Sequence, residues 1–83
     1  MHTYVIYDIV DDRIRKKIAD VCLDYGLKRI QYSAFLGDIN TTRRRGLEAK
    51  LAHEFGDAEG KIEVIGVCAK DFDQRTIIGD AER

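Results

Sequence analysis

The sequence predicts an α+β fold in which two helices cover one face of a single antiparallel sheet. Strand-like runs of β-branched and aromatic residues alternate with two segments of helical periodicity, in the order strand, helix, strand, helix, strand, short strand. The 83 residues suffice for one domain, so residues 1–83 are expected to share one core. No proline and no repeat interrupts them. Together these observations predict a ferredoxin-like two-layer sandwich.

The first strand and the first helix are predicted from composition and periodicity. The run His2–Ile9 is rich in β-branched and aromatic residues and predicts a central strand that is buried on both faces. Asp11 or Asp12 then supplies the N-cap of a helix over residues 13–25. Gly26 ends this helix in a left-handed conformation. The apolar side of the helix is formed by Ile14, Ile18, Val21, Cys22 and Tyr25.

The run Lys28–Leu36 alternates between two sets of side chains, which predicts a strand. The alternative is a bend near Tyr32 and Ser33 that divides the run into two short strands. One predicted face carries Ile30, Tyr32, Ala34 and Leu36, and the other carries Arg29, Gln31, Ser33 and Phe35. We interpret the second face as either a dimer contact or a ligand surface.

The second half of the chain predicts a helix followed by strands. The helix lies between N-cap residues within 40–42 and Gly56, because apolar residues recur every four positions at Leu47, Leu51 and Phe55. Residues 61–69 are predicted as the third strand region. The β-branched residues within 75–78 predict a short fourth strand.

A sheet with helices on one side leaves its other face open, and a chain this short buries little core alone. We therefore predict a homodimer in which the open faces of two sheets meet. Residues 71–83 are expected to form a short C-terminal strand or tail that packs on the partner's sheet edge.

The net charge of −1 excludes a globally basic nucleic-acid-binding protein, but the charge is unevenly distributed. Residues 1–45 contain nine Lys or Arg against six Asp or Glu, whereas residues 46–83 contain five against nine. The basic residues also occur in clusters, and clustered basic residues bind phosphate without a high overall pI. The clusters are Arg13, Arg15, Lys16 and Lys17; Lys28 and Arg29; and Arg43, Arg44 and Arg45.

The hydrophobic segments are too short for a membrane protein. The longest uncharged run, Ile30–Gly37, is far below the roughly 20 apolar residues of a membrane span, and no signal peptide precedes the first strand. We therefore expect a cytoplasmic protein with no membrane contact. Cys22 and Cys68 cannot form a disulfide framework and are expected to be reduced thiols in the core.

Asp8 is the strongest candidate for chemistry, because it follows Val5, Ile6 and Tyr7 in an apolar strand. A carboxylate in such surroundings is costly unless it is paired or bound to a metal. One interpretation is a cap or a salt bridge; the other is a ligand of Mg²⁺, or alternatively Mn²⁺. Magnesium needs only one or two carboxylates, so a dimer axis that doubles Asp8 would suffice. Asp11 and Asp12 are expected mainly to cap the helix.

The basic clusters and the strand aromatics each allow two interpretations. Arg13, Arg15, Lys16 and Lys17 form either a solvated helix face or a phosphate contact, and the same holds for Arg43, Arg44 and Arg45. Cations at a helix N-terminus oppose the helix dipole, which favours an external anion. The aromatics either pack in the core or stack on an unpaired base; they are Tyr4, Tyr7, Tyr32 and Phe35.

Several of these segments together resemble a known family. They are Tyr7-Asp8-Ile9 with Asp12, the basic first turns of the first helix, Asp24-Tyr25-Gly26-Leu27, the run from Arg29 to Phe35, and Gly37-Asp38. This pattern closely resembles the CRISPR-associated protein 2 family, the smaller of the two universal CRISPR adaptation proteins. The resemblance covers almost the whole chain and is strongest over residues 4–38.

The resemblance implies a homodimer that takes part in CRISPR adaptation, the capture of foreign DNA fragments as new spacers. Such a dimer bridges two dimers of a larger integrase partner and holds duplex DNA on a basic surface. Members have also been described as magnesium-dependent endonucleases on RNA or DNA. By resemblance, Asp8 is the metal ligand, and Tyr7, Arg15, Arg29 and Phe35 match positions linked to activity or nucleic-acid contact; Lys17 is a weaker match.

Four functions remain open at this point. The first is an adaptation subunit that binds duplex DNA structurally, and the second is a metal-dependent endonuclease whose catalytic residues are Asp8 and Tyr7. The third is a ribonuclease toxin on the same fold, acting on single-stranded RNA. The fourth is a small-molecule-binding regulatory domain, against which the many arginines argue. No general base is evident beside Asp8, so the adaptation subunit is favoured.

Overall fold

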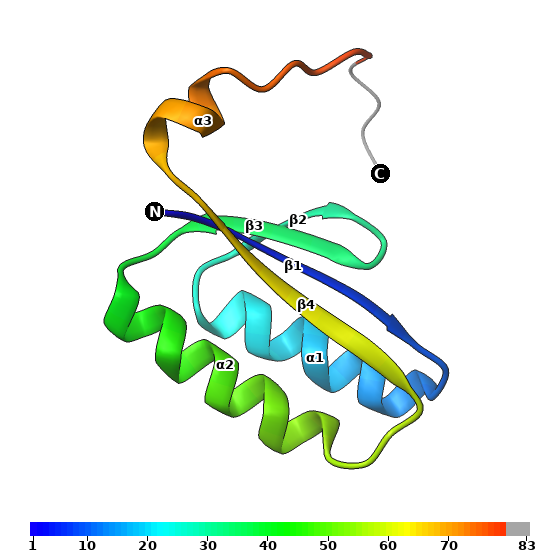
Figure 1. The fold of residues 1–83 in the computed structure, drawn as a ribbon. Coiled ribbons are helices and arrows are strands. Elements are labelled where there is room, and N and C mark those ends of the chain that lie inside the picture. Colours follow the sequence, from blue (N-terminus) through cyan, green and yellow to red (C-terminus); the bar gives the residue numbers. More distant parts are fainter. Residues whose placement is uncertain (80–83) are drawn as a thin grey trace.

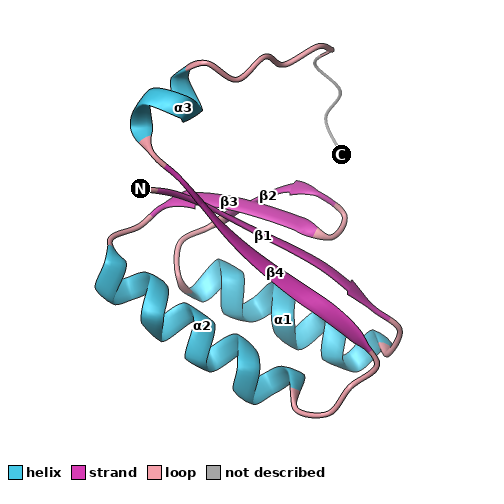
Figure 2. Cartoon of the chain, in the orientation of Figure 1, coloured by secondary structure: helices cyan, strands magenta, loops and turns pink. Residues whose placement is uncertain are grey.

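The computed structural model describes residues 1–79 as a four-stranded antiparallel sheet with two helices on one face (Figures 1 and 2). The sheet order is β2-β3-β1-β4, so the predicted ferredoxin-like sandwich is confirmed. Among these residues, no helix combines the length and the apolar character needed to cross a membrane. The elements are β1 (His2–Ile9), α1 (Asp12–Asp24), β2 (Lys28–Gln31), β3 (Ala34–Asp38), α2 (Thr41–Phe55), β4 (Gly60–Val67) and α3 (Ala69–Asp73).

Strand β1 lies inside the sheet, as predicted, between β3 and β4. Val5 faces Phe35 on one neighbour and Val64 on the other, and both pairings are antiparallel. Its side chains alternate between buried and accessible positions along the strand. The prediction that β1 is buried on both faces is wrong for the single chain, because α1 and α2 cover only one side of the sheet (Figure 1).

Helix α1 begins at the predicted cap. The Asp11 carboxylate accepts hydrogen bonds from the backbone N–H groups of Arg13 at 2.8 Å and Ile14 at 3.0 Å. These bonds hold the pKa of Asp11 below its usual value, and the bond from Ile14 has the larger effect. After Asp24 the chain turns through Gly26, whose φ of 84° is the left-handed conformation expected there.

Residues 28–38 form a hairpin rather than one continuous strand. Strands β2 and β3 pair in antiparallel fashion, and the turn between them lies at Tyr32 and Ser33. The alternative division into two short strands is therefore correct. An irregularity between Arg29 and Gln31 shifts the register, and Phe35 points into the core.

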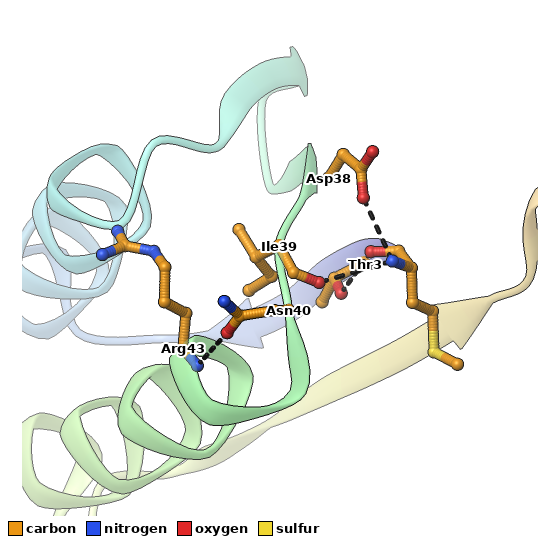
Figure 3. Close-up of polar contacts among 6 residues, drawn as sticks. Thr3, Asp38, Ile39, Asn40 and Arg43 are labelled. Atoms are coloured by element: carbon orange, nitrogen blue, oxygen red, sulfur yellow. Dashed lines mark hydrogen bonds and ion pairs between the residues drawn. The ribbon is translucent and has the colours of Figure 1, made fainter.

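Helix α2 also begins and ends at predicted residues. The Asn40 side-chain oxygen accepts a hydrogen bond from the backbone N–H of Arg43 at 2.8 Å (Figure 3), and the helix ends at Gly56. Nearby, the amino group of Met1 contacts the Asp38 carboxylate at 3.1 Å and lowers its pKa. This ion pair joins the start of β1 to the end of β3.

The segment after β4 differs from the prediction. Residues 69–73 form the short helix α3, and Phe72 stacks on the ring of His2 with 3.6 Å between ring centroids. The strand predicted at Arg75–Ile78 does not form within residues 1–79 of the single chain, where no strand lies beside it; its pairing with a partner's sheet edge stays a prediction. The segment instead lies on the side of the sheet opposite α1 and α2 (Figure 1). The expected tail over 71–83 ends outside the described residues.

The core lies between the sheet and the two long helices. Its fully buried side chains include Val5, Ile18, Phe35 and Leu47. Cys22 is also fully buried there, and burial raises the pKa of its thiol to about 12. Cys68 is exposed, so its predicted place in the core is wrong.

Candidate nucleic-acid interface

Asp8 lies on the open face of the sheet, near the end of β1. Its side chain is exposed, and Lys61 on β4 is its partner in register. The carboxylate forms no ion pair with any residue among 1–79. The fold therefore leaves this carboxylate available to an external ligand.

The donor set around Asp8 fits a metal only in part. Within residues 1–79, no three His, Cys, Asp or Glu side chains come together as a metal site. One chain thus offers a single carboxylate at this place. Magnesium retains several waters and requires one or two carboxylates, so the site fits Mg²⁺ if a second copy brings its own Asp8 close.

Tyr7 points to the other side of the sheet from Asp8, because successive residues of a strand alternate. It is only 5% exposed and its ring packs against Phe35. Burial raises the pKa of Tyr7, while the charge of Arg29 opposes that shift. The structure therefore does not bring the two predicted catalytic residues, Tyr7 and Asp8, together within one chain.

A cleft of about 430 Å³ lies between α1 and the β2 edge of the sheet. Three predicted nucleic-acid-binding residues line it: Arg15 and Lys16 from α1, and Arg29 from β2. Tyr7 and Tyr32 also line the cleft. Asp12 and Asp20 are its acidic members, so the cleft carries an excess of one positive charge. Its net positive charge and the exposed ring of Tyr32 suit an anionic ligand with an aromatic part.

The three cations of the cleft are held differently. Arg15 donates a hydrogen bond to the Ile9 carbonyl at 3.1 Å and pairs with Asp12. Lys16 pairs with Asp20 at 3.5 Å, and both of these side chains are exposed. Arg29 has no hydrogen-bond acceptor and no acidic partner among residues 1–79, and its guanidinium lies 5.0 Å from the Phe35 ring centre. Arg29 is therefore the cation best placed to bind an external phosphate.

Phe35 requires a correction. The sequence predicted a contact with nucleic acid, but its side chain is 0% exposed. The β2–β3 turn places it opposite Arg29 and Val5, on the side of the sheet that the helices cover. A buried ring cannot stack on a base. Phe35 instead makes a cation–π contact with the Arg29 guanidinium.

A model of the family described as CRISPR associated protein Cas2 matches residues 1–75. The chain belongs to this family. A "CRISPR-associated endoribonuclease Cas2" of Desulforudis audaxviator is 46% identical over 72 residues, which are 87% of this chain and 68% of that protein. A "CRISPR-associated endonuclease Cas1/endonuclease Cas2 fusion" of Thermoproteus tenax is 36% identical over 93% of this chain and 27% of its own length.

The fold of this Cas2-family chain also matches a solved structure. Streptococcus pyogenes Cas2 aligns with a TM-score of 0.78 over 95% of this chain and 100% of that chain. Their sequence identity is 19%, so this match bears on the fold alone. The family model and the sequence relatives, rather than this structural match, confirm the resemblance, which is strongest over residues 4–38.

The other basic residues of this Cas2-family chain do not form one surface with the cleft. Arg13 and Lys17 share a face of α1, roughly 160° around the helix from Arg15. Arg43 donates to the Tyr25 carbonyl at 3.1 Å, at the far end of α1, about 18 Å from Arg13 along the axis. The predicted basic residues are therefore divided between separate places.

Two of the three consecutive arginines are held by local contacts. Arg43 lies over the Tyr25 ring, 5.2 Å from its centre, and Arg44 pairs with Glu48 at 3.0 Å. Arg44 also donates to the Val64 carbonyl at 3.3 Å, which links α2 to β4. Arg45 is exposed, so it is the member of this cluster most accessible to a polymer.

Sequence reasoning left Tyr32 outside the predicted site, although it named the residue as a strand aromatic. The structure places it at the hairpin turn, 67% exposed, on the cleft between α1 and β2. The signal that could have found it is the interruption of the alternating pattern at Tyr32 and Ser33. That interruption marks a turn, and an aromatic ring at a turn has little core to pack against.

Proposed function

We propose that this chain is the small subunit of a cytoplasmic CRISPR adaptation complex, in which a homodimer binds nucleic acid. Its family membership supports this function, and the observation that carries it is the basic cleft between α1 and β2. Within residues 1–79, Arg29 has no acidic partner in this cleft. Arg15 and Arg29 both lie beside the ring of Tyr32. Such a site binds backbone phosphates without reading sequence.

The proposed dimer forms through the open face of the sheet. Tyr4 faces Leu36 on one neighbouring strand and Ile65 on the other, so apolar side chains cross the face in register. Ile6 and Ile65 are 40% and 41% exposed. An apolar surface of this kind is suited to a second copy of the same sheet. The same arrangement would bring two Asp8 carboxylates toward one axis.

The proposed activity is metal-dependent cleavage of phosphodiester bonds in RNA or DNA. Asp8 would hold Mg²⁺, with Mn²⁺ as a substitute, and its partner in the second copy would supply the other carboxylate. Bound there, the ion would lower the pKa of a coordinated water and neutralise a phosphate oxygen. The relative from Desulforudis audaxviator, named an endoribonuclease, supports this activity. The chain's own contribution is to fix the carboxylate at the end of a rigid central strand.

The proposed protein partner is the larger integrase subunit of the adaptation complex. The relative from Thermoproteus tenax, named a fusion of Cas1 and Cas2, supports this partner. Fusion holds two proteins at a high effective concentration relative to each other, which is useful when the two bind each other.

The test compares wild type with Asp8→Ala, and uses Asp57→Ala as a control because Asp57 is also an exposed carboxylate. Labelled RNA and duplex DNA are incubated with Mg²⁺, with Mn²⁺ and with chelator, and both cleavage and binding are recorded. Metal-dependent cleavage lost only in Asp8→Ala, with binding retained, supports the nuclease. Duplex binding without cleavage supports the adaptation subunit alone.

Other outcomes favour other functions. Cleavage of single-stranded RNA with no duplex binding would support the ribonuclease toxin. Absence of binding to either nucleic acid would contradict the proposal and favour the regulatory domain. Equal cleavage by wild type and Asp8→Ala would remove Asp8 from the catalytic role. Arg29→Ala should weaken duplex binding and its salt dependence, whereas Lys50→Ala, an exposed cation of α2, should change both less.

A further inference from the structure

Tyr32 is exposed to an extent that the fold does not explain. It is 67% exposed at the turn between β2 and β3 and lines the cleft between α1 and β2. Its ring lies outside the core cluster that contains Tyr7 and Phe35. Its contacts within the chain are with the guanidinium groups of Arg15 and Arg29, which leave most of the side chain exposed. The cleft gives a reason for the ring, since an aromatic surface binds other flat groups.

Two guanidinium groups, those of Arg15 and Arg29, lie over this ring at cation–π distance. The central carbons of Arg15 and Arg29 each lie 5.8 Å from the ring centre of Tyr32. A stacked guanidinium lies closer, as Arg75 does on Phe72 at 3.6 Å. Because Tyr32 is 67% exposed, part of its ring still faces solvent, and a cation from each of α1 and β2 lies beside it.

The guanidinium groups of Arg15 and Arg29 also have N–H donors that are not used within residues 1–79. Arg29 has no acceptor among residues 1–79, and Arg15 uses only part of its guanidinium on Ile9 and Asp12. An aromatic surface beside such donors matches a nucleotide, whose base stacks and whose phosphate accepts charge-assisted hydrogen bonds. The cleft of about 430 Å³ lies within the range of sites that hold a small ligand.

We propose that this cleft binds one unpaired nucleotide, with its base stacked on Tyr32 and its phosphate held by Arg15 and Arg29. The inference rests on the proposed function, since it assumes a nucleic-acid ligand, and adds both the residue and the single-stranded form. Bases inside a duplex are stacked on each other and cannot reach the ring. The cleft therefore favours a single-stranded segment or a frayed end over a blunt duplex.

The experiment measures binding of two DNA probes to the full chain. One probe is a single-stranded octanucleotide with a central 2-aminopurine, whose fluorescence reports stacking, and the other is a blunt duplex. The variants are Tyr32→Ala and Tyr32→Phe, with Leu23→Ala as the matched control. Leu23 is 56% exposed and lines the same cleft, so its truncation tests loss of apolar surface. Circular dichroism confirms that each variant is folded.

Tyr32→Ala should weaken single-strand binding about tenfold, because it removes the ring on which the base stacks. One base stacked on an aromatic ring contributes roughly that factor or more. Tyr32→Phe and Leu23→Ala should stay within about twofold of wild type, and duplex binding should not change. The fluorescence change of the probe should be lost with Tyr32→Ala alone.

Two results would overturn the inference while leaving the proposed function intact. One is single-strand binding by Tyr32→Ala equal to that of wild type. The other is equal weakening of single-strand and duplex binding, which would assign Tyr32 a general role in the surface. If wild type binds neither probe, the proposed function itself fails, so the two failures are distinguishable.

Discussion

Strand β1 sends one row of side chains to each face of the sheet, and the two rows meet different surroundings. On the face that the helices cover, Val5 is 0% exposed and pairs with buried Phe35. On the open face, Ile6 is 40% exposed, and the Asp8 carboxylate forms no ion pair within residues 1–79. The same backbone therefore builds a core with one row and leaves the other row accessible to solvent.

The comparison shows where function can be altered without loss of the fold. Side chains of the covered face contact both helices, so their truncation leaves a cavity. Side chains of the open face contact their strand neighbours and, at His2 and Tyr4, Phe72 of α3, so their truncation removes less buried surface. The cleft of Arg15, Arg29 and Tyr32 lies where these two environments meet, at the β2 edge.

The largest expected effect comes from comparing neighbours on β3. Phe35→Ala should lower the free energy of unfolding by about 3–5 kcal/mol, because it removes a fully buried aromatic ring. Leu36→Ala, one residue later and directed to the open face, should cost markedly less at low protein concentration. Urea unfolding at several concentrations measures both. Equal losses in the two variants would contradict the distinction between the faces.

The second prediction concerns the open face itself. Ile6→Asp should prevent the proposed dimer, because two sheets cannot meet over an introduced carboxylate. The chain should remain folded, since position 6 is 40% exposed. Analytical ultracentrifugation measures the mass of the assembly, and circular dichroism measures the fold. Val10→Asp, at a 65% exposed apolar residue beyond the end of β1, is the control and should leave the mass unchanged. A monomeric wild type would show that the open face serves another partner.

The third prediction compares Arg44, which contacts other residues of the fold, with its exposed neighbour Arg45. Arg44 is partly buried, pairs with Glu48 and donates to the Val64 carbonyl. Arg44→Ala should therefore lower the free energy of unfolding by about 1–2 kcal/mol. Arg45→Ala, at an exposed neighbour, should change it by less than about 0.5 kcal/mol. Thermal unfolding compares the two, and nucleic-acid binding should show the reverse order. Similar stability losses would mean that the link between α2 and β4 is weak.

Local signals made much of this fold predictable from the sequence. Asp11 and Asn40 cap the two long helices, and Gly26 and Gly56 follow their ends, because each motif depends only on nearby residues. Helix α3 was not predicted, since five residues are too few to show helical periodicity. The strand predicted at 75–78 is absent from the single chain for a different reason. β-Branched composition favours a strand only where a neighbouring strand completes its hydrogen bonds.

The sequence named candidate residues for the site but did not predict how they are arranged. Arg15, Lys16 and Arg29 do meet in one cleft, as clustered charges suggested. Tyr7 and Asp8, however, were grouped by family resemblance, and the alternation of a strand places them on opposite faces. Whether Asp8 acts together with another group depends on a second chain, which no pattern within one sequence specifies.

The smallest expected effect repeats the comparison between two carboxylates of one segment. Asp11 is used by the fold as a cap, whereas Asp8 is not engaged by it. Asp11→Ala should lower stability at neutral pH, and Asp8→Ala should not. Because the pKa of Asp11 is lowered by folding, its contribution is complete above its unfolded pKa, near 3.9. The contribution is then lost as the pH falls through the lower folded value.

The difference in stability between wild type and Asp11→Ala should therefore be constant from about pH 7 to 5 and then shrink below about pH 4. Asp11→Asn provides the control, since its amide oxygen still accepts the N–H of Ile14 but does not titrate. Urea unfolding across this range measures all three proteins. A gap that persists unchanged well below pH 3 would show that the cap contributes through packing rather than through its charge. In that case the negative charge of Asp11, although not its side chain, would be as dispensable to the fold as that of Asp8.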